Sequence, residues 1–257
     1  MARKSSGETS EGFGEIVKTI VYALLIALVF RVFLFQPFSI PSSSMKPTLL
    51  IGDYLFVSKY AYGYSNSSIP FSPPLFEGRV WFTPPKRGDV IVFKNKKDGN
   101  KDYIKRLIGL PGDKVQVQAG VVFINGAAVK MEAVDPFVEP VDLRSRQRCA
   151  IEQKRDGVLV CVKEQFVEIL PNNVTHMTLN ESNNRVGDNT KVFEVPAKHY
   201  FFMGDNRDNS QDSRFHGGHF IPEADLIGRA EIIFLSSEGS PFFPWEWRFG
   251  RLFNSIN

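Results

Sequence analysis

A long apolar run near the N-terminus stands apart from the alternating pattern of the rest of the chain. Residues 16–35 read IVKTIVYALLIALVFRVFLF, with Lys18 and Arg31 as the charged residues. Twenty helical residues span about 30 Å, the thickness of the hydrocarbon core of a bilayer. Long basic side chains near the ends of such a helix can reach the aqueous interface. The pattern therefore predicts a transmembrane anchor helix over residues 16–36.

The flanks of this run favour a retained anchor over a cleaved signal peptide. A signal peptide has an apolar region of about 7–15 residues followed by small residues at the cut. This run is longer and closes on the bulky sequence VFLFQPF, and Gln36-Pro37 is expected to end the helix. Because Arg3 and Lys4 favour a cytoplasmic N-terminus, the polar residues 1–15 are expected to form a flexible cytoplasmic tail.

The chain after the anchor shows the two-residue alternation of β-strands and no long helical period. The pairs Ala119-Gly120 and Asn125-Gly126 can each turn the chain between two strands. The pattern therefore predicts that residues 37–257 form an all-β domain of antiparallel sheets. The predicted strands cover residues 53–57, 89–93, 114–118, 121–124, 193–195, 200–203 and 230–235.

Two stretches interrupt the alternation. Residues 64–86 are rich in Ser and Pro and are expected to form a surface loop, while the polar residues 142–190 are expected to form a less regular insertion. The predicted fold class is therefore mainly β, with a single N-terminal transmembrane helix before the β domain.

Composition narrows the function classes. The 31 Lys and Arg nearly balance the 28 Asp and Glu, which argues against a nucleic-acid-binding protein with a concentrated basic face. Hydrophobic residues make up 43% of the chain, too many for a disordered protein. The two cysteines exclude a disulfide-rich miniprotein and a four-cysteine zinc site, and leave room for one disulfide.

Three polar segments could carry chemistry: residues 41–48, 102–113 and 204–214. The first contains three consecutive serines, and a serine nucleophile needs a base. A Ser-His-Asp triad is conceivable because Asp212 lies near His216, but no histidine lies in a recognisable protease motif. The four histidines are His176, His199, His216 and His219.

Lys46 is one candidate base, because Ser43-Ser-Met-Lys46 matches the S-x-x-K pattern of β-lactamases. That pattern works when a helical turn stacks the serine against the lysine. Pro47 disfavours a helical Lys46, and neither the Ser-Asp-Asn nor the Lys-Thr-Gly partner motif occurs.

Lys105 is the other candidate base. Strand alternation would place it on one face with Tyr103 and Leu107. Burial there would lower the pKa of the lysine, as a lysine base requires. The alternation leaves a second possibility open, in which the Lys105 stem is covered and its charged head reaches water.

The third segment superficially resembles a calcium-binding loop that would begin at Asp205. The sixth position is then Ser210, where such loops have glycine, and the twelfth is His216, where they have glutamate. The segment is better interpreted as turns fixed by its Asp, Asn and Ser side chains.

Taken together and in this order after one membrane anchor, the three segments resemble bacterial type I signal peptidase. The resemblance spans roughly Phe38 to Arg229, with residues 142–190 unmatched. Its motifs are FSIPSSSMKPTLLIGDYLFVSKYAYG, RGDVIVF, DYIKRLIGLPGD, GDNRDNSQDSR and the GR at 228–229. The ordered set is far more specific than any one motif.

The resemblance implies a serine endopeptidase with a Ser/Lys dyad, in which Ser44 is the nucleophile and Lys105 the general base. The Ser42 hydroxyl and the Ser44 N–H would form the oxyanion hole. Ser210 would hydrogen-bond to the lysine and orient it, with Asp212 and Arg214 as a supporting ion pair. The residues implied to line shallow pockets for small side chains are Phe38, Ile40, Leu49, Leu55, Val92, Tyr103 and Ile104.

The implied activity is cleavage of signal peptides from exported preproteins after small residues, of the Ala-x-Ala type, without a metal or a cofactor. The implied setting is the bacterial inner membrane, with a single pass and the catalytic domain facing the periplasm or the cell exterior. The partners would be signal peptides and the lipid bilayer, with no nucleic acid, and the protein would be a monomer. In that oxidising compartment, Cys149 and Cys161 are expected to be able to form a disulfide.

One position departs from the resemblance, since many members have glycine where this chain has Ser43. If that position needs a positive φ, serine costs about 1 kcal/mol there. Two alternative functions remain: a related maturation peptidase for a transfer or pilus substrate, and a catalytically idle, membrane-anchored domain that binds peptides as an added strand. The aromatic residues 241–247 are expected to pack on the β domain, with contact to the membrane interface as the alternative.

Overall fold

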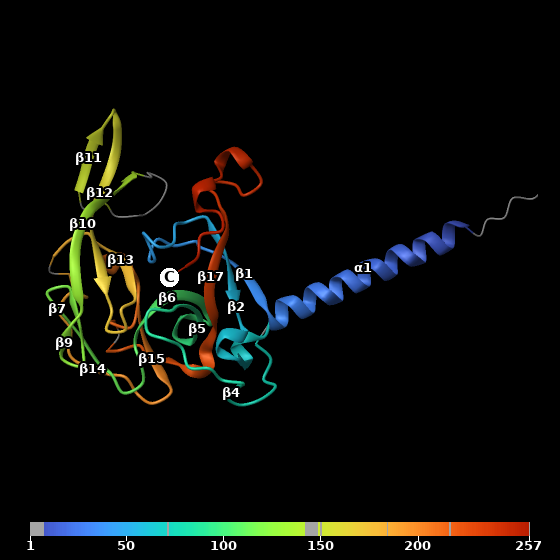
Figure 1. The fold of residues 1–257 in the computed structure, drawn as a ribbon, viewed down its shortest axis with the longest axis horizontal. Helices are drawn as coiled ribbons and strands as arrows, with labels where there is room; N and C mark the ends of the chain where they lie inside the picture. The colour runs from blue at the N-terminus through green and yellow to red at the C-terminus, as the bar shows by residue number, and fades with distance from the viewer. Residues whose placement is uncertain are drawn as a thin grey trace, which may run out of the picture.

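The computed structural model describes residues 8–70, 72–141, 149, 151–183, 185–215 and 217–256. One helix projects from a β domain (Figure 1). Helix α1 covers Glu8–Phe33. Within it, Gly12–Phe33 has a mean hydropathy of 2.2, and none of its most apolar window is buried in the protein. This helix is long and apolar enough to cross a membrane.

The N-terminal end of α1 differs from the expected boundary. The helix begins at Glu8, so the second half of the expected flexible tail is helical. Residues 1–7 of that tail lie outside the described residues. The Thr19 hydroxyl donates to the Glu15 carbonyl one turn earlier, as expected when the helix is continuous across the polar-to-apolar boundary.

The C-terminal end of the helix was placed too late by the sequence. The helix ends at Phe33, and Gln36-Pro37 belongs to strand β1, Phe35–Ser39, which pairs with β2, Asp53–Ser58. A proline has no N–H to donate and is tolerated on an edge strand, and β1 is at the edge of its sheet. The chain therefore enters the β domain directly from the helix.

A seven-stranded antiparallel sheet forms the body of the domain, in the order β1-β2-β17-β5-β6-β15-β16. Alternate residues of β2 are buried, and both Leu55 and Val57 are fully covered. The predicted strands in this sheet are confirmed. The remaining bounds are β5 Val90–Asn95, β6 Lys101–Gly109, β15 His199–Met203, β16 Ile221–Pro222 and β17 Leu226–Ser236.

A smaller sheet, in the order β14-β7-β8-β9, packs beside it around a core that includes Ile108 and Phe201. Both predicted turns are confirmed, because β7 pairs with β8 across Ala119-Gly120 and β8 pairs with β9 across Asn125-Gly126. The bounds are β7 Lys114–Gln118, β8 Val121–Ile124, β9 Ala127–Ala128 and β14 Phe193–Glu194.

The expectation of an irregular insertion over residues 142–190 is wrong for the described part of that range. A third sheet stands at the far side of the domain from α1 (Figure 1), with β12 pairing with β10, β11 and β13. Its charged residues Lys163, Glu168 and His176 are buried, which hides the apolar alternation of a strand. The bounds are β10 Lys130–Pro140, β11 Ile151–Arg155, β12 Val158–Ile169 and β13 Thr175–Asn180.

The expected surface loop over residues 64–86 is fastened to the domain at its base. A two-stranded sheet joins β3, Tyr64–Ser65, to β4, Arg79–Val80. The Arg79 guanidinium donates to the carbonyls of Gly63 at 2.7 Å and Glu223 at 3.1 Å. Five buried donors on one arginine can replace the backbone partners that a loop lacks.

The C-terminal aromatic segment packs on the domain only in part. Phe242 is 85% exposed and Trp245 is 77% exposed. Trp247 is half-buried and forms a β-bridge with Ser237, just after β17. The 3-10 helices are η1 Tyr60–Tyr62, η2 Asn66–Ser68, η3 Lys96–Asp98, η4 Arg207–Asn209, η5 Glu223–Asp225, η6 Pro244–Glu246 and η7 Phe249–Arg251.

Candidate active site

The structure brings Ser44 and Lys105 into contact across 61 positions of sequence, with 2.5 Å between Lys105 Nζ and Ser44 Oγ. Ser44 lies in the turn that links β1 to β2, and Lys105 lies in the middle of β6. Leu49 N–H donates to the Met45 carbonyl, and both side chains are fully buried, which fixes the turn on the core. A strand and an anchored turn therefore hold the two groups.

Lys105 is buried, with 4% of its surface exposed, which resolves the two possibilities that the alternation left open. Burial lowers the pKa of Lys105 to about 8, with Arg214 lowering it further, while the charges of Asp212 and Asp205 act in the opposite direction. Its Nζ also lies 3.0 Å from the Ile104 carbonyl and 5.6 Å from the centre of the Tyr103 ring. The amine can therefore be neutral at a pH where a solvated lysine is charged.

Ser42 lies beside the pair, with its Oγ 3.4 Å from Ser44 Oγ. No hydrogen bond from the Ser44 N–H is found in the described part of the chain. A hydroxyl and an unused backbone N–H therefore lie next to the Ser44 hydroxyl, where an oxyanion hole needs its donors.

Ser43 is not strained, contrary to the cost considered from the sequence. It is not among the residues with positive φ. Its Oγ accepts a hydrogen bond of 2.6 Å from Asn209 Nδ2, and its carbonyl accepts one of 3.1 Å from Asn206 Nδ2. The serine at this position therefore ties the turn to the loop over residues 204–214.

Ser210 is buried close to the dyad without a hydrogen bond to Lys105 in the described structure. Its Oγ has no hydrogen-bond partner among the described residues. A Cβ added to Gly204 would lie 2.5 Å from both the Ser210 Cβ and the Ser44 carbonyl oxygen. Glycine is therefore needed where the two segments meet.

The Asp212–Arg214 ion pair is buried behind Ser210, at 2.9 Å. Asp212 also accepts from the Gly204 N–H at 3.1 Å, and Arg214 donates to the Arg207 carbonyl at 2.5 Å. The pair therefore braces the loop from within.

A second buried pair joins all three polar segments. Arg106 forms a two-pronged bond with Asp205, at 2.8 Å for each prong, and Thr48 Oγ1 donates to Asp205 at 2.6 Å. Thr48 follows Ser44, Arg106 follows Lys105 and Asp205 follows Gly204. Sequence reasoning missed this connection, because spacing alone does not show which charges are buried together.

A pocket of about 450 Å³ opens beside the dyad. It is lined by five of the seven residues expected there: Phe38, Ile40, Val92, Tyr103 and Ile104. Leu49 and Leu55 do not line the pocket and are fully buried in the core cluster that also contains Ile40 and Val92. Lining residues that the sequence did not identify are Ser39, Pro41, Asp98, Lys101, Asp102, Asn209 and Gln211.

The alternative bases are placed elsewhere. Lys46 pairs with Glu139 at 2.5 Å. His176 is buried 3.3 Å from Glu168, which excludes it from a contact with the pocket. His216 lies outside the described residues. Asp205, where a calcium loop would have its first ligand, is bonded to Arg106 and Thr48, in agreement with the rejection of such a loop from the sequence.

Comparison with known proteins gives a consistent picture. The family model described as signal peptidase, peptidase S26, matches residues 13–235. The chain is 38% identical to a signal peptidase I of Rickettsia typhi over 244 residues, covering 91% of this chain and 85% of the relative. It is 40% identical to a signal peptidase I of Rickettsia akari over 226 residues, covering 84% and 77%. A crystal structure of a signal peptidase I from Enterococcus faecalis matches with 25% identity and a TM-score of 0.31, over 57% of this chain and 97% of that one.

Proposed function

The chain belongs to the signal peptidase family, peptidase S26, a family of serine endopeptidases that process signal peptides, and from that premise we propose that Ser44 and Lys105 perform the cleavage. The observation that carries the proposal is the 2.5 Å separation of Ser44 Oγ and a buried Lys105 Nζ. The nucleophile and the base of a serine peptidase must be within this reach of each other.

The reaction begins with neutral Lys105. Its Nζ takes the proton of Ser44 as Ser44 Oγ attacks the carbonyl carbon of the scissile bond. The tetrahedral intermediate collapses when Lys105 returns that proton to the leaving amine, which leaves the signal peptide esterified to Ser44. Water then attacks the ester, with Lys105 again accepting and returning a proton, and the signal peptide leaves as a carboxylic acid.

Charge on the tetrahedral oxygen would be stabilised by two donors. The Ser44 N–H has no acceptor in the described structure, and the Ser42 hydroxyl lies 3.4 Å from Ser44 Oγ. Donors that are fixed before the reaction stabilise the transition state without reorganisation, and removing one typically costs about 10²–10³ in kcat.

The substrate would enter the pocket as an extended strand. β1 is an edge strand, and β15 pairs with β6 only from Arg106 onward, so the pocket lies between Phe38–Ser42 and Asp102–Lys105 with strand edges on both sides. Main-chain pairing gives affinity for a peptide of any sequence. Apolar side chains at Ile40, Val92 and Ile104 leave shallow space, which favours small residues of the Ala-x-Ala type.

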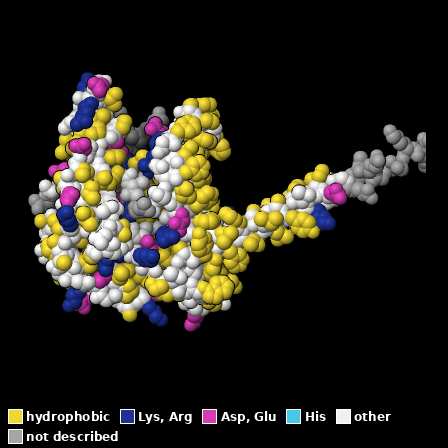
Figure 2. Space-filling view, in the orientation of Figure 1, with side chains coloured by type: hydrophobic (Ala, Val, Ile, Leu, Met, Phe, Trp, Pro, Cys, Tyr) yellow, Lys and Arg dark blue, Asp and Glu magenta, His cyan; other side chains and the backbone are white. Residues whose placement is uncertain are grey.

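The membrane would lie against the face that carries α1. Figure 2 shows hydrophobic side chains over α1 and along the adjoining edge of the domain. Aromatic rings are favoured at the interface between lipid and water. The catalytic domain would face the periplasm or the cell exterior of a bacterial inner membrane. Exposed apolar residues outside α1 include Leu34, Tyr60, Trp81, Phe242, Phe243 and Trp245.

The test of the function is cleavage of a preprotein by the full chain in detergent. We expect the wild type and the matched control Ser67→Ala to release the mature protein, and Ser44→Ala to release none. A serine-directed acylating inhibitor should label the wild type and the control at Ser44. Cleavage by Ser44→Ala would refute the nucleophile, and a wild type without cleavage or labelling would indicate the idle peptide-binding domain. Cleavage confined to a transfer or pilus protein would indicate the related maturation peptidase.

The membrane contact has a separate test in a variant without residues 1–33. Liposomes should retain this domain, and Trp245→Ala should weaken the retention several-fold, since an exposed Trp buries large apolar area in the interface. Equal retention of both variants would reject the contact by this segment.

A further inference from the structure

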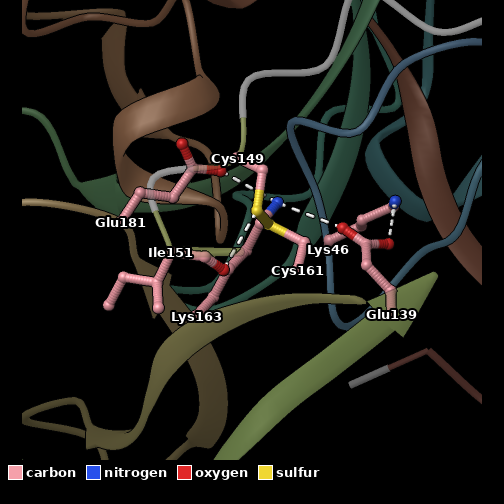
Figure 3. The surroundings of a disulfide bond; sticks show 7 residues. All are labelled: Lys46, Glu139, Cys149, Ile151, Cys161, Lys163 and Glu181. Atoms are coloured by element: carbon pink, nitrogen blue, oxygen red, sulfur yellow. Dashed lines mark hydrogen bonds and ion pairs between the residues drawn. A yellow bond between two sulfur atoms is a disulfide. The ribbon is translucent and has the colours of Figure 1, made fainter. Parts of the chain in front are cut away.

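A largely buried chain of four alternating charges runs from the turn of Ser44 into the third sheet (Figure 3). Lys46 Nζ lies 2.5 Å from one oxygen of Glu139, and Lys163 Nζ lies 3.1 Å from the other. Lys163 Nζ also lies 2.8 Å from Glu181 Oε1. The four side chains come from the serine turn, β10, β12 and the residue after β13.

Three of these four side chains are buried, and the fourth, Glu139, is partly exposed, with 16% of its side-chain surface accessible. Lys163 is 1% exposed, Lys46 is 7% exposed and Glu181 is 8% exposed. Burying charges costs more than an apolar packing of the same volume in many proteins, so such pairs are weak evidence of stability. They are better suited to fixing the relative position of two segments, because a buried charge tolerates few displacements from its partner.

Both ends of the chain of charges reach the active site. Lys46 is two positions after Ser44. At the other end, Asp208 accepts from the Glu181 N–H at 2.8 Å. Asp208 precedes Asn209, whose Nδ2 donates to Ser43 Oγ at 2.6 Å. A closed ring of contacts therefore runs from the serine turn through the third sheet and back to the same turn.

A disulfide lies next to Glu139 and Lys163, in the middle of this ring of contacts. Cys149 and Cys161 are bonded, with 5.6 Å between their Cα atoms. On β12, Cys161 is opposite Glu139 and two positions before Lys163. In Figure 3 the sulfur atoms lie beside Lys163. The crosslink joins β12 to residue 149, so it restrains the strand that carries Lys163.

We propose that Glu139 and Lys163 are positioning residues, which set the position of Ser44 relative to Lys105 through Lys46. This inference rests on the proposed function of the dyad. Neither Glu139 nor Lys163 lines the pocket. Their removal should therefore impair the chemical step and leave substrate binding intact.

The test compares kcat and KM of full-length variants in detergent on one preprotein. We expect Glu139→Gln to lower kcat about tenfold with KM within about twofold, because small misplacements of a nucleophile can cost up to about a hundredfold. Glu139→Asp, which keeps the charge, should recover part of the loss. The matched control is Glu132→Gln on the same strand, where the Lys130–Glu132 pair is exposed, and it should behave as the wild type.

A double-mutant cycle separates positioning from general damage to the fold. In a Lys46→Met background, Glu139→Gln should cause no further loss of kcat, since its effect acts through Lys46. Losses that add would overturn the proposal, as would an unchanged kcat in Glu139→Gln. If Glu139→Gln fails to fold, the same cycle with Glu139→Asp decides. A wild type that cleaves no preprotein would refute the dyad and this inference together, whereas a cleaving wild type with fully active Glu139 variants would refute positioning alone.

Discussion

Two regions of this molecule each bury a lysine, but the two lysines have different partners and serve different purposes. Lys105 at the pocket is 4% exposed, and Lys163 under the disulfide is 1% exposed. Lys163 lies between the carboxylates of Glu139 and Glu181. Lys105 has an uncharged serine hydroxyl and a carbonyl as its near partners. Burial is common to both, so the difference lies in the charge of the partner.

A third lysine shows that a lowered pKa is not sufficient for a base. Lys59 is fully buried at the base of α1, and its Nζ has no hydrogen-bond partner in the described structure. Burial, followed by the charge of Arg31, lowers the pKa of Lys59 to about 8, as in Lys105. Lys59 does not line the pocket. A lysine base therefore needs burial, the absence of a carboxylate partner and a nucleophile within reach.

The largest expected effect follows from replacing the base. Lys105→Arg should lower kcat/KM by about 10⁴-fold or more, because a guanidinium stays protonated and cannot accept the Ser44 proton. Lys59→Arg is the matched control and should keep the wild-type rate on a preprotein. Substantial activity in Lys105→Arg would indicate that a histidine is the base. An inactive Lys59→Arg would mean that the control substitution disrupts the domain.

The sequence alone predicted the strands in which apolar and polar side chains alternate between buried and exposed positions. In β2, β7 and β8, inward positions are apolar, so the strands could be placed within about a residue. The alternation failed in β12, where Lys163 and Glu168 are buried and are compensated by partners far away in the chain. It also failed for Gln36-Pro37, where pairing at a sheet edge decided the structure.

The same limit applies to the site. The resemblance placed Ser44 and Lys105, and the pocket residues Ile40 and Val92, on positions that the structure brings together. It did not separate the pocket lining from the core beneath, where Leu55 is fully buried and outside the pocket lining. The bond between Asn209 and Ser43 could not be foreseen either, because it depends on a serine at a position where relatives often have glycine.

Removing Lys163, which is paired with carboxylates, should lower the free energy of unfolding, whereas removing the unpaired Lys59 should not. Lys163→Met leaves Glu139 and Glu181 without their shared partner, and loss of one partner of a buried pair costs about 3–5 kcal/mol. Lys59→Met should instead raise the free energy of unfolding at pH 7 by up to about 3 kcal/mol, because it removes a buried charge whose pKa falls from 10.5 to about 8. Urea unfolding of both variants in detergent measures the two effects. Equal destabilisation would mean that the partners do not matter.

The gain from Lys59→Met should depend on pH in a defined direction. The folded pKa of Lys59 lies below the unfolded value, so the charged lysine destabilises the fold fully below about pH 8. The penalty is lost as the pH rises from about 8 to about 10.5, because the unfolded lysine then also becomes neutral. The advantage of the methionine variant should therefore shrink over that range, and a constant advantage would assign it to packing.

The dyad can also be broken without touching either of its members. Gly204→Ala places a methyl group 2.5 Å from the Ser44 carbonyl oxygen and from Ser210 Cβ, so the serine turn must move away. A displacement of about 1 Å in such a site can cost about a hundredfold in rate. Gly250→Ala, with no neighbour near its added Cβ, is the control. Preprotein cleavage by Gly204→Ala at the wild-type rate would show that burial of Lys105 matters more than its alignment.

The pH dependence of the wild type reports the base directly. Since the lysine must be neutral to act, kcat/KM should rise about tenfold for each pH unit below the folded pKa of Lys105 and level off near pH 8. The measurement uses a peptide substrate in detergent. If kcat/KM instead levels off near pH 10.5, Lys105 is solvated in the active enzyme. If it levels off near pH 6.5, the base is a histidine.

The smallest expected effect concerns Ser210 and decides between two roles for its hydroxyl. If it accepted a hydrogen bond from the Lys105 ammonium, as the resemblance implies, Ser210→Ala would remove a group that stabilises the charged lysine. The pKa of Lys105 would then fall, and the rising limb of kcat/KM would move to lower pH. In the structure, the hydroxyl is buried and makes no hydrogen bond to Lys105 or to any other described group. We therefore expect Ser210→Ala to lower kcat by less than about tenfold through looser packing at Gly204, with the limb unmoved near pH 8. The neighbouring Ser213→Ala is unsuitable as a control because Ser213 Oγ holds β15, whereas Ser240→Ala lies far from the pocket. A limb that moves by half a pH unit or more in Ser210→Ala alone would show that the hydroxyl binds the lysine during the reaction.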